Sequence, residues 1–199
     1  NIPTNDEGTP IAKPGEARYL LDDNNEILYG AIGNGTPTTT WGFNNSINYK
    51  NWDINIFLQG VHGFDVYNIQ QAAIVGGAGD SRSFLSPDQV NQWTPTNETD
   101  IPAFAGLYES SRYVEKGDFI RLSNLTIGDT IKDIKGLGDT TIKLYGGGQN
   151  LFLITDYSGY DPEGTSRRSA QGNEDVASGI NIGAYPNPRT YTLGVKIGF

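Results

Sequence analysis

Three carboxylates lie close together in the second half of the chain: Asp156, Asp161 and Glu163. Two carboxyl groups on either side of a sugar can hydrolyse a glycosidic bond, one as the acid and the other as base or nucleophile. The same segment contains Gly159 and Pro162, which are residue types that form turns. The sequence therefore favours turn residues over a catalytic pair.

Other patterns that carry chemistry are incomplete. The chain has one histidine, His62, and no cysteine, so neither a zinc site nor a Ser-His-Asp triad is expected. The glycines at 146–148 lack the Lys-Ser/Thr that completes a phosphate-binding loop, and we interpret them as positions where a strand bends. We expect no enzymatic activity and no cofactor.

Composition narrows the class of protein. The 199 residues carry a net charge of -9, which argues against binding nucleic acid through a basic surface. Eight Phe, eleven Tyr and 26 Gly favour β-structure with large polar loops. No run of about 18 apolar residues is present, so no transmembrane helix is predicted.

The last nine residues alternate between apolar and polar side chains. Tyr191, Leu193, Val195, Ile197 and Phe199 share one face of the predicted strand, and small or polar residues share the other. Eight steps of a strand cover about 26 Å, or roughly 19 Å of depth at a tilt near 45°. This pattern predicts a membrane-facing strand of a β-barrel, with an aromatic residue near each edge of the apolar band.

Four earlier segments show the same alternation. We predict strands at 38–49, 52–61, 118–128 and 140–152, with a two-residue turn at 50–51 between the first two. In the third segment the apolar phase shifts at Asn124, which predicts a β-bulge. A short strand around 17–21 and a short helix near 86–93 are also predicted.

The connections between these strands alternate in length. Short turns lie at 50–51 and 131–139, and long loops lie at 63–117 and 154–188, as in outer-membrane barrels with short periplasmic turns and long extracellular loops. The predicted fold is thus all-β: residues 38–199 form about five strands of a large antiparallel barrel, and residues 1–37 form an extracellular loop segment. Five strands cannot close a membrane barrel, whose smallest examples have about eight, so these strands must pair with others in the same protein or in another chain.

Four segments carry a specific resemblance. The chain reads GFNNSINYKNWDINIFLQGVHG at 42–63, YVEKGDFIRLSNLTIG at 113–128, LYGGGQNLFLITDYSGYDPE at 144–163 and YPNPRTYTLGVKIGF at 185–199. In this order and at these intervals they resemble the C-terminal part of the SusC/RagA family of TonB-dependent outer-membrane transporters, from about residue 14 to residue 199. The acidic turn that family members often carry after a Pro-Gly pair lacks its glycine here at 22–26, which argues against a calcium site.

The resemblance implies a barrel of about 22 strands with an N-terminal plug. Such a transporter imports oligosaccharides, peptides or similar nutrients with energy passed through TonB, and a SusD-like lipoprotein covers its mouth. Two alternatives stay open: a SusC-like barrel that serves as the scaffold subunit of a larger outer-membrane complex, and a free-standing soluble β-domain that binds a ligand.

Four aromatic residues fall in the predicted loops: Trp93, Tyr157, Tyr160 and Tyr185. They could stack on a sugar or contact a lid subunit, although packing of the loops on one another is the more common use of such residues. Arg167 and Arg168 form a small basic spot in an acidic chain, interpreted as a solvated loop tip or a partner contact.

Overall fold

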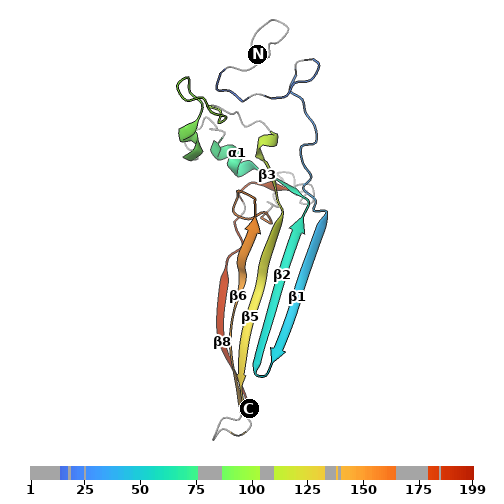
Figure 1. Ribbon diagram of the computed structural model, residues 1–199, viewed down its shortest axis with the longest axis vertical. Helices are drawn as coiled ribbons and strands as arrows, with labels where there is room; N and C mark the ends of the chain where they lie inside the picture. Colours follow the sequence, from blue (N-terminus) through green and yellow to red (C-terminus); the bar gives the residue numbers. More distant parts are fainter. Residues whose placement is uncertain are drawn as a thin grey trace.

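The computed structural model describes residues 14–17, 19–24, 26–75, 87–103, 110–132, 138, 140–164, 179–183 and 185–199. Their main body is an elongated five-stranded sheet with the order β1-β2-β5-β6-β8 (Figure 1). Its strands are β1 (Thr39–Tyr49), β2 (Trp52–His62), β5 (Phe119–Ile131), β6 (Thr141–Thr155) and β8 (Thr190–Gly198). All neighbouring pairs in this sheet are antiparallel. The all-β prediction is confirmed, and β5 and β6 each extend three residues beyond the predicted end.

The short turn between β1 and β2 is the one predicted. Tyr49 pairs with Trp52, which leaves Lys50 and Asn51 as the turn, and Lys50 adopts the left-handed conformation with φ 55°. This end of the sheet also holds the C-terminus, whereas the long connections lie at the opposite end (Figure 1). The predicted alternation of short and long connections therefore places each kind at its own end of the sheet.

The predicted bulge is confirmed in β5. Adjacent residues Phe57 and Leu58 of β2 pair with Asn124 and Leu122 of β5, which leaves Ser123 as the extra residue, and the register against β6 shifts at the same place. Because of this insertion, Arg121 and Asn124 project from the same face although they are three residues apart, which restores the alternation on both sides.

The two faces of the sheet differ in chemistry. The apolar face carries exposed large side chains from all five strands, namely Trp41, Phe43, Ile47, Tyr49, Trp52, Ile127, Ile131, Leu144, Phe152, Ile154, Tyr191, Leu193, Val195 and Ile197. The polar face carries Asp53, Arg121, Asn124, Lys143 and Lys196. Cross-strand glycines make room for the largest rings, because a Cβ at Gly60 or Gly194 would overlap the ring of Trp41 or Tyr145, respectively.

A second layer covers the end of the sheet where the long connections lie. It contains the three-stranded sheet β4-β3-β7, made of β3 (Asp65–Asn68), β4 (Val114–Lys116) and β7 (Ile180–Asn181). Its helices are α1 (Ile69–Val75) and the two 3-10 helices η1 (Pro87–Asn91) and η2 (Ser111–Tyr113). None of the helices in the described segments has both the length and the apolar character needed to cross a membrane.

The hydrophobic core lies at the junction of the two layers. Phe64, Val66, Phe119 and Tyr157 are buried against one another. The main sheet contributes to this core only at its end next to the second layer, through Phe119, Val61 and Leu153. Its apolar face stays exposed.

The long connections differ in part from their prediction. The short helix predicted near 86–93 is the 3-10 helix η1, whereas α1 and the small sheet were not predicted. The predicted strand around 17–21 is wrong: the described residues there contain only isolated pairing, such as the bridge from Leu21 to Ile27.

Candidate functional site

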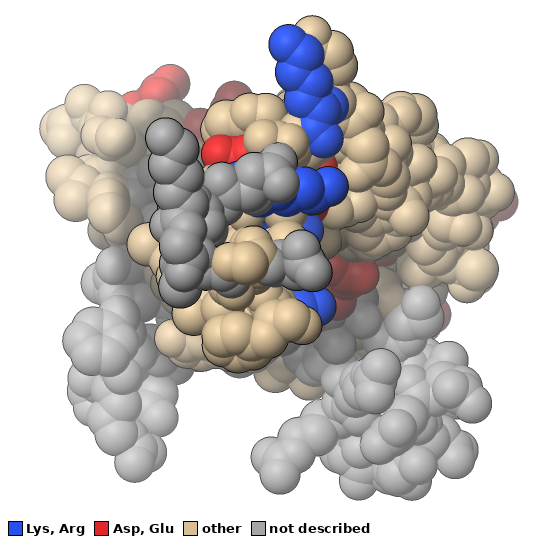
Figure 2. Space-filling model, turned by 90° about the horizontal axis from the view of Figure 1, so that it is seen from below, with Lys and Arg blue, Asp and Glu red and all other residues tan. Residues whose placement is uncertain are grey.

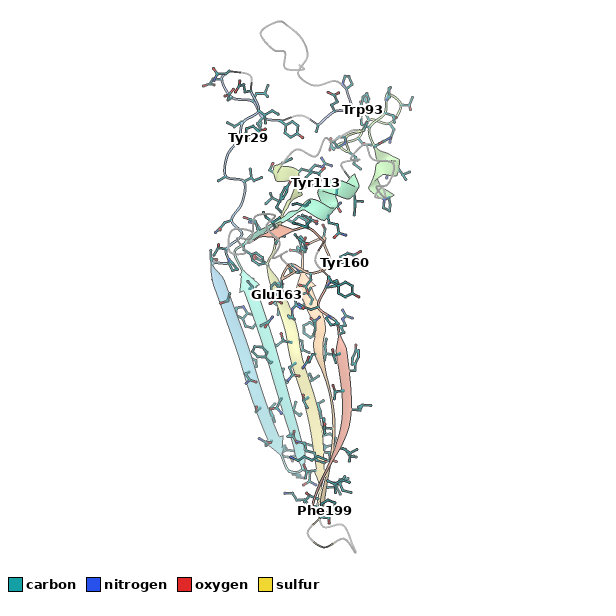
Figure 3. The ribbon with its side chains drawn as sticks, turned by 180° about the vertical axis from the view of Figure 1, so that it is seen from behind. Tyr29, Trp93, Tyr113, Tyr160, Glu163 and Phe199 are labelled. Atoms are coloured by element: carbon teal, nitrogen blue, oxygen red, sulfur yellow. The ribbon has the colours of Figure 1, made fainter. Side chains whose placement is uncertain are left out.

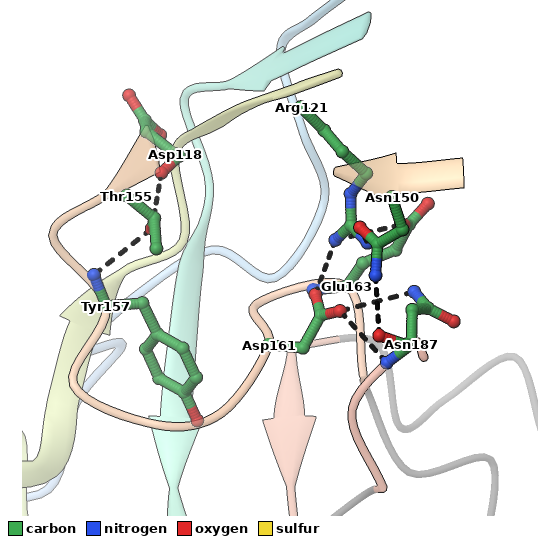
Figure 4. A network of polar contacts seen from close by, with 8 residues as sticks. All are labelled: Asp118, Arg121, Asn150, Thr155, Tyr157, Asp161, Glu163 and Asn187. Carbon is green, nitrogen blue, oxygen red and sulfur yellow. Dashed lines mark hydrogen bonds and ion pairs between the residues drawn. The ribbon is translucent and has the colours of Figure 1, made fainter. Parts of the chain in front are cut away.

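The most buried charged residues in the described part of the chain meet on the polar face, near the start of β5. Arg121 and Asp161 are each 3% exposed, and Nη2 of Arg121 lies 2.6 Å from Oδ1 of Asp161 (Figure 4). The same nitrogen lies 3.3 Å from Oε2 of Glu163, and Nη1 donates to Oδ1 of Asn150 over 2.9 Å. The guanidinium of Arg121 thus holds the segment after β6 against the sheet.

A second set of contacts ties in the segment before β8. Oδ2 of Asp161 accepts from the backbone N–H of Asn187 over 3.4 Å and from its Nδ2 over 3.2 Å. Nδ2 of Asn150 donates to the backbone oxygen of Asn187 over 2.5 Å. We call these five residues, Arg121, Asn150, Asp161, Glu163 and Asn187, the arginine clasp. It fixes two loop segments to β5 and β6 at once.

The clasp accounts for two of the three clustered carboxylates. Asp161 and Glu163 share one guanidinium, and Oδ1 of Asp161 also accepts the backbone N–H of Glu163 over 3.0 Å. Pro162 between them is fully buried, whereas Asp156 is exposed. This arrangement agrees with the turn interpretation of the segment, since a buried ion pair anchors a loop.

Tyr157 belongs to the core of the loop layer. It is 5% exposed, and its hydroxyl accepts from Nδ2 of buried Asn181 over 2.8 Å. Burial raises the pKa of the Tyr157 hydroxyl to about 12. The adjacent Ser158 donates through its backbone N–H and its hydroxyl to Glu115, over 2.7 Å each. Tyr157 is thus placed as a packing residue, the alternative use foreseen for loop aromatics.

Of the other predicted loop aromatics, Trp93 lies among the long connections and Tyr160 lies closer to the main sheet (Figure 3). Trp93 is half-buried and packs against the segment at Gly15, where an added Cβ would come within 2.7 Å of its ring. Tyr160 and Tyr185 are 67% and 90% exposed and line a cavity of about 350 Å³ next to the clasp. The structure therefore brings these two tyrosines together and keeps Trp93 and Tyr157 apart from them.

The alternation predicted for the last strand is present in β8. Leu193 pairs with Gly146, Val195 with Leu144 and Ile197 with Ile142, so these side chains continue the apolar face. Leu193 is 91% exposed and Phe199 fully exposed. Within the described residues, β1 and β8 each keep one edge without a partner strand.

Charges on the polar face are partly paired across strands. Nζ of Lys143 in β6 lies 2.6 Å from Oδ1 of Asp53 in β2, above Gly128 of the strand between them. Seen from below, Lys and Arg side chains form a column near the middle of the view, with acidic side chains beside them (Figure 2). Such charges are expected on a face that meets water rather than hydrocarbon.

The remaining predicted positions hold no catalytic or metal arrangement. The imidazole of His62 lies 3.7 Å from Asp118 and stacks on Trp41. Oδ1 of Asp22 accepts the backbone N–H groups of Asn24 and Glu26 over 2.9 Å each, and these bonds lower its pKa. No cluster of metal-ligating side chains is found in the described part of the chain. Arg167 and Arg168 lie outside the described residues.

Sequence reasoning missed the clasp partners Asn150 and Asn187. One signal could have indicated the clasp: Arg121 is a charged residue within the apolar stretch 119–122 of a predicted strand. An arginine in such surroundings needs a carboxylate partner.

Comparison of sequences finds relatives of this chain among outer-membrane receptors. No protein-family model matches the chain. TonB-dependent receptor P3 of Formosa agariphila is 40% identical over 194 residues, which cover 93% of this chain and 19% of the receptor. This chain is a relative of the TonB-dependent receptors of the SusC/RagA family. TonB-dependent receptor SusC of Bacteroides thetaiotaomicron is 31% identical over 100 residues, which cover 47% of this chain and 8% of SusC.

Comparison with solved structures shows a shared fold. The RagAB peptide transporter superimposes with a TM-score of 0.67 at 23% identity, over 81% of this chain and 17% of that one. The open-open state of the RagAB peptide importer gives a TM-score of 0.62 at 20% identity, over 100% of this chain and 20% of that one. The chain thus spans about a fifth of the length of the SusC/RagA relatives it matches, and the predicted resemblance to this family is confirmed.

Proposed function

We propose that this chain forms part of the wall and of the extracellular loops of an outer-membrane β-barrel that imports nutrients. The observation that carries the proposal is the division of one five-stranded sheet into an exposed apolar face and a charged face. A barrel wall needs both, because its outer face meets lipid and its inner face meets water or a plug. The free edges of β1 and β8 then pair with the remaining strands of the barrel.

In this proposal the loop layer lies outside the cell and the turn at Lys50 and Asn51 faces the periplasm. The long connections fold into a packed layer with its own small sheet and core, as expected of a loop region that shapes an opening. The substrate is an oligosaccharide or a peptide, a SusD-like lipoprotein covers the mouth, and TonB supplies energy to a part of the protein outside this chain.

Uptake measured in cells tests the proposal. The full-length protein should import labelled oligosaccharides or peptides, and deletion of TonB should abolish that import while leaving the amount of barrel in the outer membrane unchanged. Membrane insertion without any TonB-dependent uptake would instead favour a scaffold subunit.

A further inference from the structure

The cavity beside the arginine clasp combines two exposed rings with an exposed cation. Its volume is about 350 Å³, within the range of small-ligand sites. Tyr160 and Tyr185 are both mostly exposed, and Arg189 is exposed and forms no ion pair with a residue that the structure describes. Exposed rings beside an uncompensated guanidinium form a surface suited to a ligand with an apolar face and a negative charge.

Three clasp residues, Asn150, Asp161 and Asn187, also line this cavity, whose lining we call the rim. Most of their polar side-chain atoms are already engaged within the clasp. Both side-chain atoms of Asn150 are engaged, with Arg121 and with Asn187. Both oxygens of Asp161 are engaged, and its charge is balanced by Arg121. The side-chain groups left for a ligand are therefore the two tyrosines, Oδ1 of Asn187 and the guanidinium of Arg189.

The backbone of the rim disfavours an extended peptide. Peptides that lie along a protein edge need main-chain N–H donors at regular intervals. Pro186 and Pro188 have no N–H, and the N–H of Asn187 donates to Asp161. Three consecutive residues thus offer no donor, whereas a sugar needs only a ring to stack on and side chains for its polar groups.

We propose that Tyr160, Tyr185 and Arg189 form a binding site for an anionic oligosaccharide, with the guanidinium on a carboxylate of the ligand and the rings against its sugar faces. This inference rests on the proposed import function in one respect, because it places the site on the path of an imported solute.

Binding to the full-length protein, purified in detergent, tests the site. The probes are the linear trisaccharides of galacturonic, mannuronic and guluronic acid, each measured by calorimetry beside its neutral parent sugar. At least one uronate should bind more tightly than its neutral parent, and added salt should reduce that difference.

Substitutions test whether the uronates bind at the proposed site. Arg189→Gln should weaken uronate binding about tenfold or more and leave neutral sugars unchanged, as expected for loss of a charge-assisted hydrogen bond. Tyr185→Ala should weaken both, and Tyr185→Phe, which keeps the ring, should retain most of the affinity. Lys196→Gln removes a cation from β8, the strand that follows Arg189, at a position that does not line the cavity, and should change nothing.

Several results would overturn the inference. These are the absence of binding by all three uronates, unchanged uronate affinity in Arg189→Gln, or tighter binding of triglutamate than of any uronate. Binding in detergent needs neither TonB nor energy. A protein that binds uronates through Arg189 but imports nothing would therefore refute the proposed function and leave this site standing.

Discussion

The two faces of β8 lead to a matched pair of substitutions at adjacent residues. Val195 lies on the apolar face, 61% exposed and paired with Leu144, whereas Lys196 lies on the polar face opposite Lys143. Val195→Arg and Lys196→Arg introduce the same side chain one residue apart, on opposite faces. If the apolar face meets lipid, only the first should impair assembly of the full-length protein.

The magnitude follows from the position of Val195 along the strand. It lies four residues from both Tyr191 and Phe199, which is about 9 Å of membrane depth from each at about 3.3 Å per residue and a tilt near 45°. An arginine on the lipid face near the midplane costs about 2–4 kcal/mol, or roughly 30- to 700-fold in a folding equilibrium. Lys196→Arg keeps the charge on the polar face and should change the equilibrium by less than about 0.5 kcal/mol.

The assay measures folded protein in isolated outer membranes by the mobility shift between unheated and heated samples. Val195→Met serves as a control for a longer apolar side chain and should resemble the parent. Leu193→Arg, nearer the aromatic edge, should show a smaller loss than Val195→Arg, because the cost falls toward the interface. Equal folded amounts of Val195→Arg and Lys196→Arg would refute the assignment of the two faces.

Three further predictions concern the loop layer. Asp161→Asn should destabilise the full-length protein by up to about 3–5 kcal/mol in chemical unfolding, because it removes the buried counter-charge of Arg121 and leaves only the more exposed Glu163 beside the guanidinium; a parent-like midpoint would show that the clasp is dispensable. Tyr157→Phe should cost about 1–3 kcal/mol by leaving the amide of Asn181 without its acceptor. Because the pKa of Tyr157 is about 12 when folded and near 10 when unfolded, its contribution is complete below pH 10 and should be lost between about pH 10 and 12; a parent protein as stable at pH 12 as at pH 9 would contradict this. A cysteine at Thr96 should react with an impermeant maleimide on intact cells, whereas one at Asn51 should react only after lysis; the reverse would invert the topology.

The strands of the main sheet could be predicted because each one separates two environments. Alternation of apolar and polar residues reports both faces directly, and even the bulge at Ser123 appeared as a shift of phase at Asn124. The exposed apolar set of the last strand followed from the same rule.

The loop layer could not be predicted in the same way. The parallel pairing of Tyr67 with Ile180 joins residues far apart in the sequence through strands too short to alternate visibly. The sequence held one usable signal for helix α1, namely Asn68, because asparagine is a preferred N-cap residue. In the structure Oδ1 of Asn68 accepts the backbone N–H of Gln71, as an N-cap does. The path of the loop after β6 depends on which carboxylate reaches Arg121, and three were available within eight residues.

The central claim is that one face of this sheet meets lipid and the other does not, and a spin-label scan of β8 tests it most directly. The 199 residues contain no cysteine, so single cysteines can be placed at positions 192, 193, 195, 196 and 197 of this segment and labelled in a full-length protein from which any other cysteine has been removed. Labels at Leu193, Val195 and Ile197 should collide with oxygen and be shielded from a water-soluble nickel chelate, whereas labels at Thr192 and Lys196 should not be exposed to lipid-dissolved oxygen. Equal access of the nickel chelate to both sets would contradict the account.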